Sequence, residues 1–150
     1  MEYGAAFWPP LFYFIFAKKV KPKFKLFVPA IIWFCIIFYL LIMPSDDIPN
    51  FPFLELIYFD KWVHAGLFGG LVILTSFPFF KTKYASRSLY IQITIYAICY
   101  GVAMEYVQKY LTNGDRDFDI LDMVADAAGA VIGLALINMW LKKQEKKTSA

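Results

Sequence analysis

Acids, an amide and an arginine are concentrated in one stretch of the sequence, residues 105–133, between two strongly apolar segments. Glu105 and Gln108 are three positions apart, so on a helix they share a face. After a turn-forming Asn-Gly pair and Arg116, three acids recur at i, i+3 and i+7, which is again one helical face: Asp119, Asp122 and Asp126. Ionisable groups inside apolar segments mark functional sites, so we expect the function to lie here.

A second polar group stands at the start of another apolar segment. Asp60 and His64 are four positions apart and share a helical face, with Lys61 beside them. Histidine can act as a general base or bind a metal near neutral pH. A lone histidine is also commonly a hydrogen-bonded packing residue, so both interpretations of His64 stay open.

Composition restricts the class of protein. The chain has 150 residues, of which 60% are hydrophobic and 20% aromatic, and the apolar residues fall in long runs. A soluble domain of this size is rarely so apolar, so we expect a single membrane domain over residues 1–150. The formal net charge is only +3, and the basic residues flank the apolar runs, which argues against nucleic-acid binding.

Four apolar runs are long enough to cross a bilayer, and they predict an all-α, integral membrane four-helix bundle. The expected spans are residues 26–43, 60–80, 89–111 and 120–141. At a rise of about 1.5 Å per residue, even the shortest covers roughly 27 Å, close to the thickness of the hydrocarbon core. Residues 5–17 are aromatic but shorter and contain two prolines, so we expect a short interfacial N-terminal segment there.

The charges predict the orientation of these spans. Twelve of the 15 basic residues lie before the first span, between the second and third, or after the fourth. Basic loops stay on the cytoplasmic side, so we expect both termini to be cytoplasmic and the protein to be a multi-pass protein of the cytoplasmic (inner) membrane. The five lysines before residue 26 can also contact anionic lipid.

With this orientation, polar groups of three spans lie near one outer surface. At the helical rise, Glu105 is about 9 Å and Asp126 about 10 Å below that surface. An ionisable residue inside a span costs up to about 2.5–3.5 kcal/mol unless it is paired or hydrated. We therefore expect an outward-facing polar cavity lined by His64, Glu105 and the candidate ligand-binding residues Asp60, Lys61, Gln108, Arg116, Asp122 and Asp126.

Structural roles are alternatives for several of these residues. Glu105 can form a buried pair with Arg116, and Asp119 can cap the helix that begins at residue 120. Gly129 and Gly133 form a GxxxG pattern, which lets a neighbouring helix approach closely. Taken together, these alternatives predict a closed, paired network in place of a wet cavity.

No metal and no cofactor are expected from the sequence. It has neither an HxxxH nor a DDxxD spacing, so a divalent ion held by Glu105, Asp122, Asp126 and His64 is only an alternative. Cys35 and Cys99 lie inside apolar runs, where we expect small packing residues rather than a disulfide or a metal pair. No serine or cysteine lies near enough in sequence to nominate a nucleophile.

Two motifs together resemble those of the VanZ-like family of membrane proteins. DKWVH at residues 60–64, followed by Phe68, resembles that family's DKxxH…[FY] element. EYVQ at residues 105–108, Arg116 and DMVADAAGAVIG at residues 122–133 resemble its ExxQ…R…DxxxNxxGxxxG element, which gives a motif core of residues 60–133. The family usually has asparagine where this chain has Asp126. The resemblance implies a multi-pass cell-envelope protein and a link to low-level resistance to the glycopeptide teicoplanin, without a mechanism.

Two functions of different classes follow. In the first, the outer cavity binds or modifies an amphiphilic envelope molecule, a membrane lipid, lipid-linked wall precursor or lipoglycopeptide, with His64 and Glu105 as candidate catalytic acid/base pair. Lys61 and Arg116 would hold its phosphate or carboxylate. In the second, the protein is a structural or assembly subunit that docks another membrane protein, and its polar cluster is an internal network. Whether the protein is an enzyme stays open.

Overall fold

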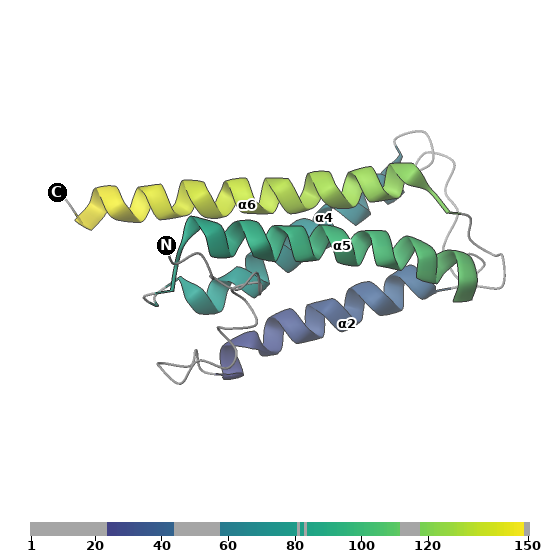
Figure 1. The fold of residues 1–150 in the computed structure, drawn as a ribbon, viewed down its shortest axis with the longest axis horizontal. Coiled ribbons are helices and arrows are strands. Elements are labelled where there is room, and N and C mark those ends of the chain that lie inside the picture. Colours follow the sequence, from purple (N-terminus) through teal and green to yellow (C-terminus); the bar gives the residue numbers. More distant parts are fainter. Residues whose placement is uncertain (1–23, 44–57, 81, 83, 112–117, 149–150) are drawn as a thin grey trace, which may run out of the picture.

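The computed structural model describes residues 24–43, 58–80, 82, 84–111 and 118–148. They form four long α-helices that run along one common axis, each reversing the direction of the one before (Figure 1). Two short 3₁₀ helices, η1 (Phe24–Phe27) and η3 (Phe77–Phe79), extend the first and second of them. The long helices are α2 (Val28–Ile42), α4 (Phe59–Ser76), α5 (Arg87–Leu111) and α6 (Ile120–Thr148).

The predicted all-α fold with four helices is confirmed. Three helical segments are long and apolar enough to cross a membrane: Phe24–Ile42, Phe59–Phe79 and Ile120–Gln144. They identify an integral, multi-pass membrane protein. α5 has 25 residues and lies beside the other helices, but it is not one of these three segments, so its crossing of a membrane stays a prediction. The interfacial segment predicted over residues 5–17 lies outside the described residues.

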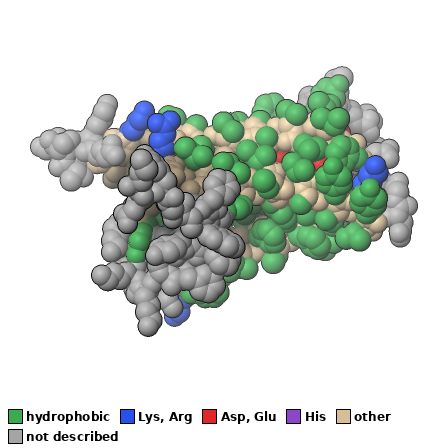
Figure 2. Space-filling model, in the orientation of Figure 1, with side chains coloured by type: hydrophobic (Ala, Val, Ile, Leu, Met, Phe, Trp, Pro, Cys, Tyr) green, Lys and Arg blue, Asp and Glu red, His purple; other side chains and the backbone are tan. Residues whose placement is uncertain are grey.

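The outside of the bundle is apolar, as lipid-facing helices require. Figure 2 shows a face covered largely by hydrophobic side chains, with acidic atoms visible only in small patches toward one end. Cys35 and Cys99 are free and exposed on this outer surface. The expectation that they pack inside the bundle is therefore wrong, because each stands on the side of its helix that faces away from the core.

α4 and α6 are the most closely packed pair of helices. A Cβ placed on Gly129 would lie 2.6 Å from the Cα of Ala65, and one placed on Gly133 would lie 2.7 Å from the carbonyl oxygen of Gly69. Real Cβ atoms essentially never come so close to backbone. The GxxxG pattern of α6 therefore does what the sequence predicts, and it brings the backbones of α4 and α6 into contact.

Two further contacts between helices run from a side chain to the backbone, one joining α2 to α4 and one joining α5 to α2. The indole nitrogen Nε1 of Trp33 on α2 donates to the carbonyl oxygen of Leu67 at 2.9 Å. Gln108 on α5 donates from Nε2 to the carbonyl oxygen of Leu41, also at 2.9 Å. The interior between the helices is filled by apolar side chains that include Ile37, Phe68, Val72, Tyr90, Met104 and Ala130.

Candidate functional site

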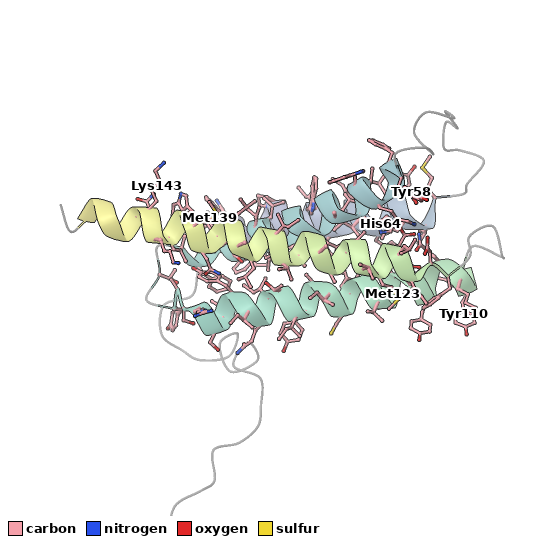
Figure 3. The ribbon with its side chains drawn as sticks, turned by 90° about the horizontal axis from the view of Figure 1, so that it is seen from above. Tyr58, His64, Tyr110, Met123, Met139 and Lys143 are labelled. Atoms are coloured by element: carbon pink, nitrogen blue, oxygen red, sulfur yellow. The ribbon has the colours of Figure 1, made fainter. Side chains whose placement is uncertain are left out.

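A polar cluster occupies one end of the bundle, where α4 and α6 begin and α5 ends. Figure 3 shows His64 near this end, together with Tyr58 and Met123, whereas Lys143 lies at the far end of α6. We define the polar cluster as Asp60, Lys61 and His64 from α4, Glu105 from α5, and Asp119, Asp122 and Asp126 at and after the start of α6. The helix periodicities that predicted this convergence are therefore correct for these seven residues.

The outer part of the cluster is built around Lys61. Its Nζ lies 2.9 Å from Asp60 Oδ2 and 2.7 Å from Asp122 Oδ1, and it also forms an ion pair with Asp119. The side chain of Lys61 is 18% exposed, those of Asp60 and Asp119 60% and 39%. We call Asp60, Lys61 and Asp119 the rim, because they are the solvent-accessible layer of the cluster.

Asp119 connects the rim with the interior. Its carboxylate oxygen Oδ1 accepts a hydrogen bond from the backbone N–H of Leu121 at 2.8 Å, so the predicted N-terminal cap of α6 is confirmed. The ion pair with Lys61 holds the pKa of Asp119 below its ordinary value. The backbone N–H of Asp119 in turn donates to Glu105 Oε2 at 3.0 Å, which ties the start of α6 to α5.

Beneath the rim lies a buried inner layer of the cluster, made of His64, Glu105 and Asp126. Their exposed fractions are 4%, 0% and 1%. His64 Nδ1 lies 2.9 Å from Asp126 Oδ1, and its Nε2 lies 3.7 Å from Asp122 Oδ1. The imidazole is thus flanked by a carboxylate on each side, an arrangement that fixes the ring's orientation.

Two carboxylate oxygens of this inner layer have no hydrogen-bond partner among the described residues. They are Oε1 of Glu105 and Oδ2 of Asp126, and each is buried to less than 1 Å² of accessible surface. Buried polar atoms are nearly always hydrogen-bonded, and an unsatisfied one costs about 1–3 kcal/mol. The inner layer therefore contains more hydrogen-bond acceptors than its own contacts satisfy.

Gly101 makes the space that Asp126 occupies. A Cβ at this position of α5 would lie 2.7 Å from Asp126 Oδ2 and 2.9 Å from its Cβ. Sequence reasoning missed this residue. A signal was present, because Gly101 is four positions before Glu105 and thus lies on the same helical face.

The expectation of an open cavity is wrong, because the inner layer of the cluster is closed. The glycine contact between α4 and α6 brings the helices so near that their own polar side chains fill the space at this end of the bundle. Gln108 is also buried and bonds to the backbone of α2, which makes it a link between helices. Arg116 lies outside the described residues, so its predicted pairing with Glu105 stays a prediction.

The cluster carries more negative than positive charge. Five carboxylic acids surround one lysine and one histidine in it, and Lys61 already contacts three of the acids. A cation or a hydrogen-bond donor is therefore attracted to this end of the bundle, and a bare anion is repelled.

No protein-family model, no curated protein and no solved structure matches the chain. The resemblance to the VanZ-like family rests on the motif residues alone.

Proposed function

We propose that the protein is a VanZ-like protein of the cytoplasmic membrane whose polar cluster binds or modifies the head group of an amphiphilic envelope molecule. The observation that supports this most is the layered arrangement of the cluster. A rim accessible to solvent lies directly above a buried His64–Asp126 pair and Glu105. A head group at the membrane surface would meet the rim first, while its acyl chain stays beside the apolar outer faces of the helices.

The unsatisfied oxygens favour ligand binding over a purely structural network. A polar network that only fixes a fold gains most when every member is paired. Here Glu105 and Asp126 each keep one buried oxygen without a partner among the described residues. Groups that lower stability in this way are typical of functional sites, where activity and stability conflict.

The side chains of the inner layer suit proton transfer. His64 is held by Asp126 through Nδ1, the arrangement in which a carboxylate orients a histidine that acts as general base. Glu105 stands against the same point and can supply the second proton-transfer group. Hydrolysis or transfer of a head group is the reaction class that this pair supports.

The charge of the cluster restricts the ligand. Lys61 is neutralised by its three carboxylates, so it does not offer a free positive charge to a phosphate. The head group therefore carries amino or hydroxyl donors toward the rim, or it arrives together with a cation. A lipoglycopeptide or a lipid-linked wall precursor meets this description, in line with the teicoplanin theme of the resembled family.

Glu105→Gln separates this function from the structural alternative. The amide keeps the shape, retains an oxygen for the N–H of Asp119, and removes a buried charge that lacks full compensation. We expect purified Glu105→Gln to melt at or above the wild-type temperature, while it loses teicoplanin resistance or rescue of an envelope defect. Glu145→Gln, the same acid-to-amide exchange near the end of α6 opposite the polar cluster, serves as the control and should keep activity.

The alternative is an assembly subunit whose cluster is an internal network, and the rim favours it because Lys61 ties α4 to α6. Under that function activity in Glu105→Gln falls only as far as the amount of folded protein falls. Destabilisation with proportional loss of activity would therefore replace the ligand site by the structural network.

A further inference from the structure

Three helices each direct one buried side chain of metal-ligand type to a single point. His64 from α4, Glu105 from α5 and Asp126 from α6 place one ligating atom each within 4.8 Å of the other two. All three side chains are at least nine-tenths buried. An imidazole nitrogen and two carboxylate oxygens form a donor set that suits Zn²⁺ and Mn²⁺.

The unpartnered oxygens are independent evidence for a ligand at this point. Glu105 Oε1 and Asp126 Oδ2 have no hydrogen-bond partner among the described residues, although both are buried. The hydrogen bonds among these side chains leave both oxygens without a partner. A bound cation would satisfy them. The charges agree, because two carboxylates and a neutral imidazole together balance a divalent ion.

The surroundings resemble the outer partners of metal ligands. The backbone N–H of Asp119 holds one oxygen of Glu105 at 3.0 Å and leaves the other free. On the ring of His64, Nε2 faces Asp122, a carboxylate outside the ligand set, at 3.7 Å. Carboxylates and backbone groups behind the ligands orient them in this way in metal sites.

The distances fit an ion after a small rotation of side chains. Bonds of roughly 2.0–2.2 Å to a tetrahedral ion keep its ligand atoms about 3.4 Å apart. His64 Nδ1 and Asp126 Oδ1 are 2.9 Å apart, so this pair has to open by about half an ångström, while Glu105, whose ligand atom lies within 4.8 Å of the other two, turns toward the ion. Three protein ligands leave a fourth position open, as in catalytic zinc sites.

We propose that His64, Glu105 and Asp126 bind a divalent transition-metal ion of the Zn²⁺ or Mn²⁺ kind. The ion supplies the positive charge that the cluster lacks. With the ion bound, His64 and Glu105 would serve as ligands and not as the proton-transfer pair, and the open position of the ion can take an oxygen of an anionic head group. That second step rests on the proposed function, whereas binding of the ion does not. The bound ion would also explain how an acidic cluster can accept a phosphate.

Metal titration of the purified full-length chain tests the proposal. The protein is freed of metal with a chelator in detergent and titrated with Co²⁺, Zn²⁺, Mn²⁺ and Mg²⁺, with the visible absorption of Co²⁺ and the melting temperature as readouts. We expect one ion per chain, a higher melting temperature with Zn²⁺ or Mn²⁺, and at least tenfold weaker binding in Glu105→Gln and in Asp126→Asn. The double variant Cys35→Ala/Cys99→Ala, which removes the two exposed thiols, should bind like the wild type.

Three results would overturn the proposal: no binding above a detergent blank, unchanged affinity in both carboxylate variants, or preference for Mg²⁺ over the transition metals. The two variants remove different ligands, so misfolding of one still leaves the other as a test. Failure of the metal site is distinct from failure of the proposed function. Retention of an amphiphile in the presence of excess chelator would disprove the metal's part and leave the head-group site standing.

Discussion

Replacing Gly129 with alanine is expected to push α4 and α6 apart beside the polar cluster. The new methyl group would lie 2.6 Å from the Cα and the carbonyl carbon of Ala65 and closer still to its carbonyl oxygen, whereas ordinary contacts begin near 3.4 Å. The neighbour is backbone and cannot rotate away, so the helices have to separate by nearly an ångström. Overpacking of this kind costs about 1–3 kcal/mol, occasionally more.

The displacement should also reach the site. Ala65 follows His64 directly, and Gly129 lies one helical turn after Asp126. A separation of nearly an ångström would stretch the 2.9 Å contact between His64 Nδ1 and Asp126 Oδ1 beyond hydrogen-bond distance. Gly129→Ala should therefore lose stability and ligand or metal binding together.

Gly66 provides a matched control on α4. A Cβ at that position meets nothing within 4 Å. Because glycine inside a helix is destabilising by roughly 0.5–1 kcal/mol relative to alanine, Gly66→Ala should leave the melting temperature unchanged or raise it. Ala65→Gly should fail to rescue Gly129→Ala, since the clash is with main chain. The measurement is thermal unfolding in detergent, and equal melting temperatures for Gly129→Ala and Gly66→Ala would refute the packing.

Three further outcomes follow from the structure. Gly101→Ala should displace Asp126, lowering stability by about 1–3 kcal/mol and metal affinity with it, as thermal unfolding and Co²⁺ titration can measure; full binding would contradict the placement. Because the rim lysine lowers the pKa of Asp119, this ion pair adds stability above the ordinary aspartate pKa of 3.8 that is lost as the pH falls through the lowered value. Asp119→Asn should therefore lower the melting temperature near neutral pH and flatten its fall in acid, and an unchanged pH profile would disprove the contribution. Trp33→Phe removes one hydrogen bond between helices and should cost about 0.5–1.5 kcal/mol in denaturant unfolding, whereas Trp62→Phe, at a position 70% exposed, should cost nothing measurable.

Local features of the sequence were sufficient to predict much of this fold. Apolar runs place most helix ends to within a few residues, because a bilayer-spanning helix needs about 20 apolar residues. The exception is α6, which continues past the predicted end at residue 141 to Thr148, through its basic tail. Spacing along α6 predicts that Asp119 caps the helix and that Gly129 and Gly133 face a neighbour. Both features depend on one helix and its period, which the sequence contains directly.

Contacts between helices were harder to predict. Lys61 binds carboxylates 58 and 61 positions away, and which of them it meets depends on the rotation of α4 against α6. That rotation is set by the contact of Gly129 with Ala65. The same close approach buries His64, Glu105 and Asp126, so a closed inner layer stands where a wet cavity was expected. The close packing also gives Gly101 a role that no local pattern assigns.

Native mass spectrometry of the protein extracted in mild detergent tests most directly whether the polar cluster holds a ligand. We expect that the folded wild type retains an amphiphile and that Glu105→Gln, at an equal or higher melting temperature, loses it. The same adducts at the same occupancy on both proteins would contradict this expectation and assign the polar cluster to the scaffold of the bundle.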